Sequence, residues 1–361
     1  MASAFKNILR VAVMTDSAVE IKNVYKIFGP HPERVIDLVR SGVSKQQLME
    51  SHGHVLGLEN VNIEIAAHEI QVIMGLSGSG KSTLIRHINR LIEPTSGEII
   101  VGGKNVLSMD KNELMNFRRF DASMVFQKFS LLPHRTVAEN VAYGLEIQKI
   151  EKQIVEQRSR RWIDRVGLSG FEKYYPAQLS GGMQQRVGLA RALATDADIL
   201  LMDEPFSALD PLIRTDMQDV LLSLQEELNK TIIFITHDLD EALRIGDSVA
   251  ILKDGVIVQK GSPQTIILNP VDDYVAAFTK DINRGRVLQV GSIMNPQIPD
   301  HHLKIERDMV VEEALQVLVK EGKKSASVVN KSKIVGTIDM DTLISSLARP
   351  EISDAENSHP H

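Results

Sequence analysis

The stretch that most restricts the possible folds is Gly75–Ser82, which reads G-L-S-G-S-G-K-S. It matches the phosphate-binding loop pattern G-x-x-x-x-G-K-[ST], in which glycines let successive backbone N–H groups curl around phosphate oxygens. The apolar run Ile70–Met74 before it predicts a buried strand, and Lys81–Leu91 after it has helical character. A strand, this loop and a helix in that order predict a nucleotide site in an α/β fold, with phosphate at the helix N-terminus.

A second group of candidate residues follows another apolar run, Ile199–Met202, which ends in Asp203 and Glu204. Acidic residues commonly end strands, so this run gains its meaning from the phosphate loop upstream. Lys81 can reach the β- and γ-phosphates, and the Ser82 hydroxyl can ligate Mg²⁺. Asp203 is then expected to hold the Mg²⁺ water shell, and Glu204 to polarise an attacking water.

The rest of the chain alternates strands with helices, which predicts an α/β fold with a mainly parallel sheet. Residues 119–186 turn polar and helical, and a helical subdomain is expected near 128–186. Its expected buried face comprises Trp162, Ile163, Val166 and Leu168. Further strands are expected at Val19–Phe28, Asn60–Ile65 and Thr231–Thr236, with a helix at Leu212–Leu228.

The composition excludes several function classes. Zero cysteine removes disulfides, thiolate zinc sites, iron–sulfur clusters and cysteine nucleophiles. With 41 Lys and Arg against 47 Asp and Glu, the formal net charge is −6, which disfavours nucleic acid as a partner. No run reaches the ~18 apolar residues that span a bilayer. Residues 1–18 are expected to be an N-terminal extension rather than a secretory signal.

The motif that separates nucleotide-binding families is Leu179–Gln185, which reads L-S-G-G-M-Q-Q. Ser180 and two glycines open a helix there, which makes another small anion-binding N-terminus. With this motif the sequence resembles the ATP-binding-cassette (ABC) family, whose signature is LSGGQ; Met183 stands where Gln is usual. The resemblance covers roughly Val19 to Phe278. It implies a P-loop ABC ATPase domain over 19–282, with ATP and Mg²⁺ as its ligands.

The resemblance also implies roles for single residues. Phe28 matches the aromatic that stacks on adenine, Gln127 the Mg²⁺-binding Q-loop, and His237 the switch histidine. Alone, these could be a core aromatic, a polar strand end and a structural histidine, but five ordered motifs favour the family roles. The expected catalytic residues are Lys81, Gln127, Glu204 and His237. The expected Mg²⁺ ligands are Ser82, Gln127 and Asp203. The expected nucleotide contacts are Phe28, Gly75, Ser77, Gly78, Ser79, Gly80, Lys81, Ser82, Thr83, Ser180, Gly181, Gly182, Gln184 and Asp210, the last in the D-loop Ser207–Asp210.

The partners follow from the same resemblance. In the ABC family, Ser180 and Gly182 of one copy close over the ATP held by Lys81 of the other, which implies a homodimer with two ATP molecules between the copies. The segments Gly29–His54, 124–137 and 281–284 resemble ATPase subunits of glycine betaine/proline betaine importers or of related choline, carnitine or trimethylamine N-oxide importers. That implies a membrane permease, indirectly a substrate-binding protein, and a place at the cytoplasmic face of the membrane.

Two alternatives stay open at this point. The chain could serve an importer of another small solute, or it could be a non-transport ABC ATPase of DNA repair or translation. The interval from Ser82 to Leu179 carries no heptad run of the kind found in chromosome-organising ATPases. A translation factor of this family would be expected to carry two cassettes.

Beyond Asn283 the pattern changes. Residues 283–348 resemble a single CBS (cystathionine-β-synthase) module, and 349–361 form an acidic tail. Its expected elements are a helix at Val311–Leu318, strands at Ser327–Val329 and Ile334–Ile338, and a last helix at Leu343–Leu347. Because such modules normally occur in pairs, we expect the modules of two chains to pair with each other.

Two surface features complete the sequence. Five lysines within fourteen residues, named here the lysine cluster, are either a solvated face or a patch that docks on anionic lipid and releases it as salt rises: Lys320, Lys323, Lys324, Lys331 and Lys333. The segment Gly29–His54 is expected to be a surface insertion with one short helix at Arg34–Arg40. Six histidines outside the motifs are expected at the surface and not as metal ligands: His52, His54, His301, His302, His359 and His361.

Overall fold

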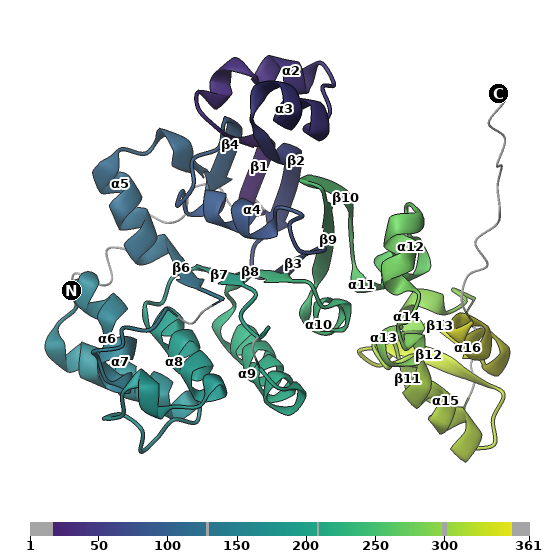
Figure 1. The fold of residues 1–361 in the computed structure, drawn as a ribbon. Coiled ribbons are helices and arrows are strands. Elements are labelled where there is room, and N and C mark those ends of the chain that lie inside the picture. The colour runs from purple at the N-terminus through teal and green to yellow at the C-terminus, as the bar shows by residue number, and fades with distance from the viewer. Residues whose placement is uncertain (1–16, 128–129, 208, 298–301, 349–361) are drawn as a thin grey trace. The chain divides into compact units, whose positions relative to one another are not determined.

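The computed structural model describes residues 17–127, 130–207, 209–297 and 302–348 (Figure 1). Residues 1–16, Ala208, His301 and the tail 349–361 therefore lie outside the described residues. The chain divides into two compact units, residues 1–260 and 261–361, which are described separately below. No helix among the described ranges is long and apolar enough to cross a membrane.

The centre of the first unit is a six-stranded sheet with the order β10-β9-β3-β8-β7-β6. Its strands are β3 (Ile70–Met74), β6 (Ala122–Val125), β7 (Ile199–Asp203), β8 (Thr231–Thr236), β9 (Ser248–Lys253) and β10 (Val256–Gly261). The five strands from β9 to β6 run parallel. Every residue of β3, β7 and β8 is buried, as expected for parallel strands covered on both faces. The predicted parallel sheet is confirmed.

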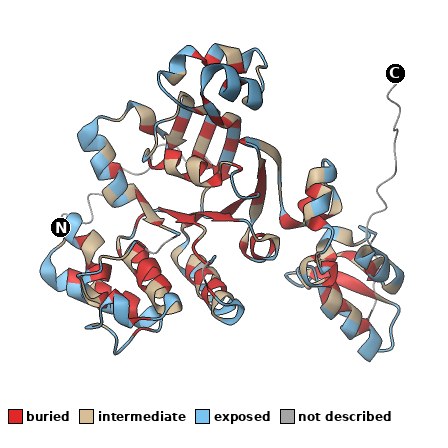
Figure 2. Cartoon of the chain, viewed as in Figure 1, coloured by how far each residue is buried: buried red, intermediate tan, exposed pale blue. Residues whose placement is uncertain are grey.

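A second, antiparallel sheet has the order β2-β1-β4-β5. Its strands are β1 (Ser17–Phe28), β2 (Val55–Ala66), β4 (Ser96–Val101) and β5 (Lys104–Asn105). Leu84, Ile85 and Ile88 on α4 (Lys81–Ile88) belong to a buried cluster that contains side chains of both sheets. The helix that follows the phosphate loop is therefore held between two sheets, which Figure 2 shows as a band of buried residues.

The helices α6, α7 and α8 form a group of their own (Figure 1). The α-helices of the first unit after α4 are α5 (Lys111–Asn116), α6 (Val137–Ile147), α7 (Lys152–Arg165), α8 (Gly181–Ala194), α9 (Pro211–Leu228) and α10 (Leu239–Ile245). The buried face predicted at Trp162, Ile163, Val166 and Leu168 is confirmed. The stretch from about Arg119 to Arg186, expected to be polar and helical, also contains a strand, because Ala122–Val125 pair with β7 as strand β6.

The insertion Gly29–His54 is more ordered than expected. Besides a 3-10 turn (Pro32–Arg34) and α2 (Ile36–Arg40), it contains a second helix, α3 (Lys45–His52), whose N-cap Ser44 forms a capping box with Gln47. Four apolar side chains of the insertion, Val35, Ile36, Val39 and Leu48, form a small cluster with Ile27 of β1 and Leu56 of β2. His52 and His302 are exposed as expected, but His54 is only 6% exposed, so its expected surface position is wrong.

The second unit has a three-stranded sheet with the order β11-β12-β13, in which β11 and β12 are parallel and β12 and β13 antiparallel. Its strands are β11 (Lys304–Glu306), β12 (Ser325–Asn330) and β13 (Lys333–Asp339). Its helices are α11 (Pro263–Leu268), α12 (Asp273–Thr279), α13 (Arg284–Val287), α14 (Val290–Ile293), α15 (Val311–Lys320) and α16 (Met340–Leu347). The predicted strands and helices of this region are confirmed, and β11 is an addition.

The boundary between the units differs from the one expected near Asn283. Helix α11 belongs with the second unit, because Gln264 Nε2 donates to the Val287 carbonyl oxygen at 3.2 Å and Arg284 Nη2 donates to that of Ile267 at 3.2 Å. The sequence change at residue 283 is a change of composition inside this unit.

Candidate active site

The phosphate loop joins β3 to α4 and has the shape that its sequence predicts. A Cβ atom on Gly75 would lie 2.1 Å from the Leu252 carbonyl oxygen, so only glycine fits there. Gly80 caps α4 with φ +105°, a left-handed conformation that also favours glycine. Ser79 is buried, and its hydroxyl has no hydrogen-bond partner among the described residues. An unpartnered buried hydroxyl beside a helix N-terminus fits a phosphate ligand.

Lys81 is held under the loop. Its Nζ donates to the carbonyl oxygens of Gly75 at 2.8 Å and Leu76 at 3.0 Å, and its side chain is 4% exposed. Burial lowers the pKa of Lys81, and the Glu204 carboxylate, 3.7 Å from Nζ, opposes that shift. A cation kept in this place can compensate the charge of phosphate oxygens bound by the loop.

Asp203 lies at the end of β7 and is fully buried. The Ser82 hydroxyl donates to Asp203 Oδ1 at 2.7 Å, so the two predicted Mg²⁺ ligands are adjacent. Arg86, which the sequence analysis missed, donates from Nη2 to Asp203 Oδ2 at 3.0 Å. An oxygen-only pair beside a phosphate loop suits Mg²⁺, which commonly keeps several waters and takes the remaining oxygens from substrate phosphates.

Glu204 is the point at which the predicted catalytic side chains meet. Gln127 Nε2 donates to Glu204 Oε2 at 2.9 Å, and His237 Nδ1 lies 3.3 Å from the same oxygen. With Lys81 on its other oxygen, the carboxylate gathers residues from four separate segments. Glu204 has φ +45°, uncommon for a residue with a side chain, and its N–H donates to the Ile235 carbonyl oxygen at 3.1 Å. The backbone is thus turned to aim this carboxylate into the cluster.

The switch histidine is followed by a further contact that the sequence analysis missed. Arg214 Nη1 on α9 donates to Asp238 Oδ2 at 2.8 Å, while Asp238 Oδ1 accepts the Glu241 N–H as the N-cap of α10. Asp238 was visible as the neighbour of His237, but nothing in the sequence pointed to Arg214. Together they tie the segment after β8 to α9.

Phe28 ends β1 with 40% of its surface exposed. Lys26 Nζ lies 5.0 Å from the centre of its ring. A Cβ atom on Gly57 would lie 2.7 Å from Phe28 Cε2, so the ring lies against the backbone of β2. One side of an aromatic ring packed on backbone, with much of its surface open, is an arrangement on which a base can stack.

The signature residues and the D-loop meet each other but not the phosphate loop. Ser180, Gly181, Gly182, Leu209 and Asp210 line one cavity of about 420 Å³, to which no residue of Gly75–Ser82 contributes. Ser180 caps α8 by accepting the Met183 N–H at 3.3 Å, and Asp210 caps α9 by accepting the Ile213 N–H at 3.1 Å. Gln184 Nε2 donates to the carbonyl oxygens of Pro176 and Leu179, so its amide holds the segment just before α8.

Several known proteins resemble this chain in sequence and fold. Residues 58–207 match the family model described as ABC transporter. The glycine betaine transport ATP-binding protein OpuAA of Bacillus subtilis is 54% identical over 76% of this chain and 66% of its own length. The glycine betaine/carnitine transport ATP-binding protein GbuA of Listeria monocytogenes is 47% identical over 95% of this chain and 85% of its own.

Among solved structures, the dimeric ATP-binding cassette MJ0796 bound to ADP and Pi is 33% identical, with a TM-score of 0.59 over 68% of this chain and 98% of that one. CbiO1 of Clostridium perfringens, part of an ABC transporter complex, is 25% identical, with a TM-score of 0.59 over 70% of this chain and 92% of that one. The expected fold class of the first unit is confirmed.

Proposed function

The chain belongs to the ABC transporter family of ATP-binding proteins, and on this premise we propose that it is the ATP-hydrolysing subunit of an importer for glycine betaine or a related quaternary amine. The observation that carries the enzymatic part is the convergence of Lys81, Gln127 and His237 on the Glu204 carboxylate. The solute class is supported by the names of the relatives.

The described residues can divide the reaction among them. Glu204 accepts a proton from the attacking water, and His237 and Gln127 keep that carboxylate in place. Lys81 compensates charge on the terminal phosphates, with the loop N–H groups around them. Ser82 and Asp203 would hold Mg²⁺, which would supply positive charge beside the phosphates.

The test of the proton acceptor is Glu204→Gln, which keeps the shape of the side chain and removes its basicity. We expect turnover of ATP to fall by about 10²–10⁴-fold, because general-base catalysis is lost, while ATP still binds. The dimer should then accumulate with ATP in place, which size-exclusion chromatography with and without ATP measures. Glu98→Gln, at an exposed carboxylate of β4, is the control. Normal turnover in Glu204→Gln would assign the proton acceptor elsewhere.

We propose a homodimer in which each signature segment closes over the ATP of the other copy. The separation of the signature cavity from the phosphate loop within one chain supports this, because the signature segment then needs a nucleotide from outside its own chain. The MJ0796 cassette of similar fold is itself described as dimeric. Each copy would thus supply half of two sites.

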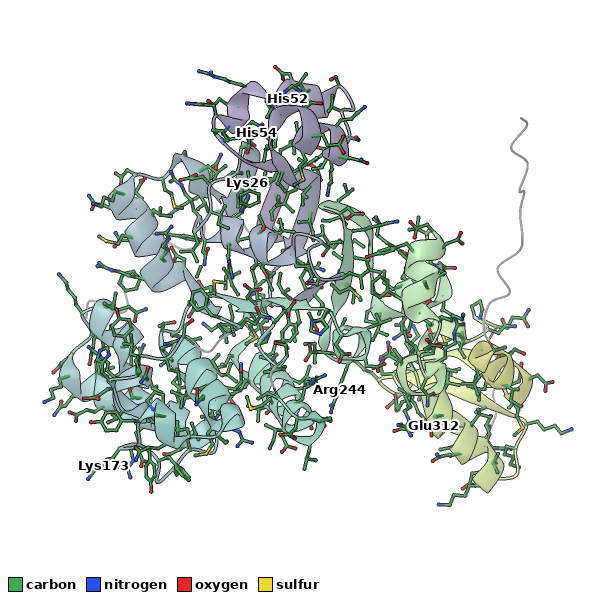
Figure 3. The ribbon with its side chains drawn as sticks, viewed as in Figure 1. Lys26, His52, His54, Lys173, Arg244 and Glu312 are labelled. Carbon is green, nitrogen blue, oxygen red and sulfur yellow. The ribbon has the colours of Figure 1, made fainter. Side chains whose placement is uncertain are left out.

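The proposed permease contact is a groove of about 710 Å³ between α6 and α7. Its apolar lining comprises Ala138, Ala142, Ile150, Val155 and Ile163, and charged side chains such as Lys173, which Figure 3 labels, line it as well. The Ser159 hydroxyl also lines it, buried and without a partner among the described residues. An apolar groove of this size suits an apolar helix from a membrane protein that also brings a hydrogen-bonding group.

Ser159→Arg would fill this groove with a long charged side chain. We expect the basal ATPase of the full chain to stay unchanged and its stimulation by a reconstituted permease to disappear, because docking is lost. Gln157→Arg, two residues away, exposed and outside the groove, is the matched control. Equal stimulation of both variants would move the docking site away from α6 and α7.

The solute class rests on several relatives together. Their names include glycine betaine, carnitine, trimethylamine N-oxide and choline, which are methylated amines. A second candidate, an importer of another small solute, is favoured by the methionine import ATP-binding protein MetN of Staphylococcus haemolyticus, 45% identical over 63% of this chain. Uptake into vesicles that hold the full transporter, tested with quaternary amines and with methionine, distinguishes them. Uptake of methionine alone would overturn the first proposal.

For the second unit we propose a CBS-like module that pairs with its copy. Val319 on α15 and Ile344 on α16 are 66% and 53% exposed, which supports a covered apolar face in the dimer. Ile344→Glu should weaken the dimer in analytical ultracentrifugation, whereas Ser345→Glu, exposed on the same helix, should not. Identical dimer affinities would contradict pairing through this face.

We also propose that the lysine cluster binds anionic lipid. All five side chains are exposed, and each lysine near an anionic surface contributes about 1 kcal/mol. Flotation of the full chain with phosphatidylglycerol vesicles should fall as KCl rises and should be weaker when the five lysines are changed to glutamine. Binding that ignores both changes would leave the cluster as a solvated face.

A further inference from the structure

The aromatic ring of Phe28 stands where the chain leaves the sheet and returns to it. Phe28, the last residue of β1, pairs with Val55, the first residue of β2. Between them lies the insertion, so its first and last residues, Gly29 and His54, are brought side by side. Any movement of this closure reaches the backbone of Phe28 directly, because Gly29 is its neighbour.

One side chain joins the two ends. His54 Nε2 lies 2.8 Å from the Pro30 carbonyl oxygen, and Nδ1 lies 2.6 Å from that of His52. Both contacts join a ring nitrogen to a backbone carbonyl oxygen, so the imidazole bridges the start of the insertion at Pro30 and its end at His52. The ring is 6% exposed, so water does not replace either contact easily. Figure 3 labels His54 within the part of the ribbon that holds the insertion.

The residue after Phe28 is shaped to receive this ring. Gly29 has φ +145°, and a Cβ atom there would lie 2.4 Å from His54 Cδ2. A glycine is required both by the backbone conformation and by the close approach of the imidazole. The ring of His54 therefore packs on the peptide that follows Phe28, and its hydrogen bond to Pro30 holds the next peptide.

The aromatic ring itself is held by the neighbouring strand. Phe28 lies against the backbone at Gly57 and beside the Lys26 ammonium, with the rest of its surface open. The side chain is thus placed by β2, and its backbone by His54. Both restraints act at the same end of the antiparallel sheet.

We propose that His54 is a positioning residue for the base of ATP: by locking Gly29 and Pro30 it fixes the direction of the Phe28 ring on which adenine stacks. The inference rests on the proposed role of Phe28 and extends it to a residue outside the nucleotide-binding motifs. His54 touches no phosphate-binding residue in its described contacts, so its effect is confined to the base.

The test separates the base from the phosphates. His54→Phe keeps a ring and removes both ring nitrogens, while Gly29→Ala keeps the nitrogens and displaces the ring. For each full-length variant we would measure KM and kcat for ATP, and the inhibition constant of inorganic tripolyphosphate, which has no base. We expect KM for ATP to rise about three- to tenfold, a part of the stacking contribution. The value of kcat and the inhibition constant of tripolyphosphate should stay within about twofold, a range that corresponds to less than about 0.5 kcal/mol.

Two reference variants make the outcome decisive. His52→Gln changes an exposed side chain but keeps the carbonyl that His54 contacts, so it should leave KM unchanged. Phe28→Ala should raise KM for ATP at least as much as His54→Phe. If Phe28→Ala raises KM and neither His54→Phe nor Gly29→Ala does, the positioning role is overturned and the proposed function stands.

Two further outcomes would also overturn the inference. A parallel rise in the inhibition constant of tripolyphosphate would show general damage to the site instead of a displaced base. An unchanged KM in Phe28→Ala would mean that adenine does not stack on Phe28, and His54 would then have no ring to position. Thermal melting of each variant accompanies the kinetics, and Gly29→Ala carries the test alone if His54→Phe fails to fold.

Discussion

The two sides of the ATP site use their side chains differently. On the phosphate-loop side, side chains of Lys81, Gln127 and His237 converge on Glu204. On the signature side, Ser180 and Asp210 are engaged as caps of their own helices. What that side presents is mainly backbone at the N-terminus of α8, which can bind an anion but cannot transfer a proton.

This contrast teaches a division of labour. In the proposed dimer, one side would carry the reacting groups, and the other would recognise bound phosphate and complete the site. A change on the first side should therefore impair chemistry within its own chain, whereas a change on the second should impair the site of the partner copy.

The largest effect is expected from a mixing experiment that tests this division. Lys81→Ala and Ser180→Arg should each lower ATPase activity by about 10²–10³-fold. An equal mixture should regain about one quarter of the normal sites, because half of the randomly formed dimers contain one intact pair. The control mixes Lys81→Ala with a chain that carries both Lys81→Ala and Ser180→Arg. No dimer in that mixture contains an intact Lys81, so no intact pair forms. Absence of recovery in the first mixture would mean that both sides act within one chain.

The next effect concerns the packing of the reacting side. His87 on α4 is fully buried, and burial lowers its pKa to about 4 from 6.5. The folded state therefore binds its proton less readily than the unfolded state, so stability is full above pH 6.5 and falls as the pH drops toward 4. By pH 5 this amounts to about 2 kcal/mol. In urea titrations, His87→Leu should flatten this part of the pH profile, and His68→Leu at an exposed histidine should not.

A smaller effect is expected from Arg86, which holds the Mg²⁺-side carboxylate. Arg86→Met removes the hydrogen bond to Asp203 and should raise the Mg²⁺ concentration needed for half-maximal ATPase activity by about tenfold. Arg161→Met, at a largely exposed arginine of α7, is the control. An unchanged Mg²⁺ requirement would make Arg86 a purely structural partner.

The smallest effect compares two helix caps. Asp210→Ala and Asp110→Ala each remove an N-cap carboxylate and should each lower the free energy of unfolding by about 1 kcal/mol. Only Asp210 lies beside the signature, so only its change should also weaken the ATP-dependent dimer. Chemical denaturation and sedimentation with ATP measure the two quantities. If Asp110→Ala weakened the ATP-dependent dimer as much as Asp210→Ala does, Asp210 would contribute only to the stability of the fold.

The phosphate-loop side, where the side chains converge on Glu204, could be predicted almost entirely from sequence. Its residues follow buried strands, and the carboxyl ends of parallel strands meet at one edge, so Lys81, Asp203 and His237 had to lie close together. Arg86 and Arg214 escaped because an arginine on a helix has many possible partners. Which carboxylate each of these arginines contacts is decided only by how the helices pack in the folded chain.

The signature side and the insertion were less predictable. The expected contacts of Gln184 and Asp210 with nucleotide stay a prediction, because within one chain their polar atoms bind neighbouring backbone groups. Strand β6 has four residues, and its pairing with β7 depends on a neighbour far along the chain. Helix α3 did carry a local signal, the Ser44–Gln47 capping box, whereas the burial of His54 depends on how the insertion closes.

The pairing of Phe28 with Val55 has a consequence for how this chain can change over time. Because the two strands are already joined in register at that pair, the strand pairing does not require the segment between them, although its side chains cover Ile27 and Leu56 at this end of the sheet. Residues can be gained, lost or exchanged there without shifting any strand, provided that the closure at its base is kept. The insertion is thus a place where a regulatory or partner-specific segment can be grafted onto an ATPase whose catalytic parts stay fixed.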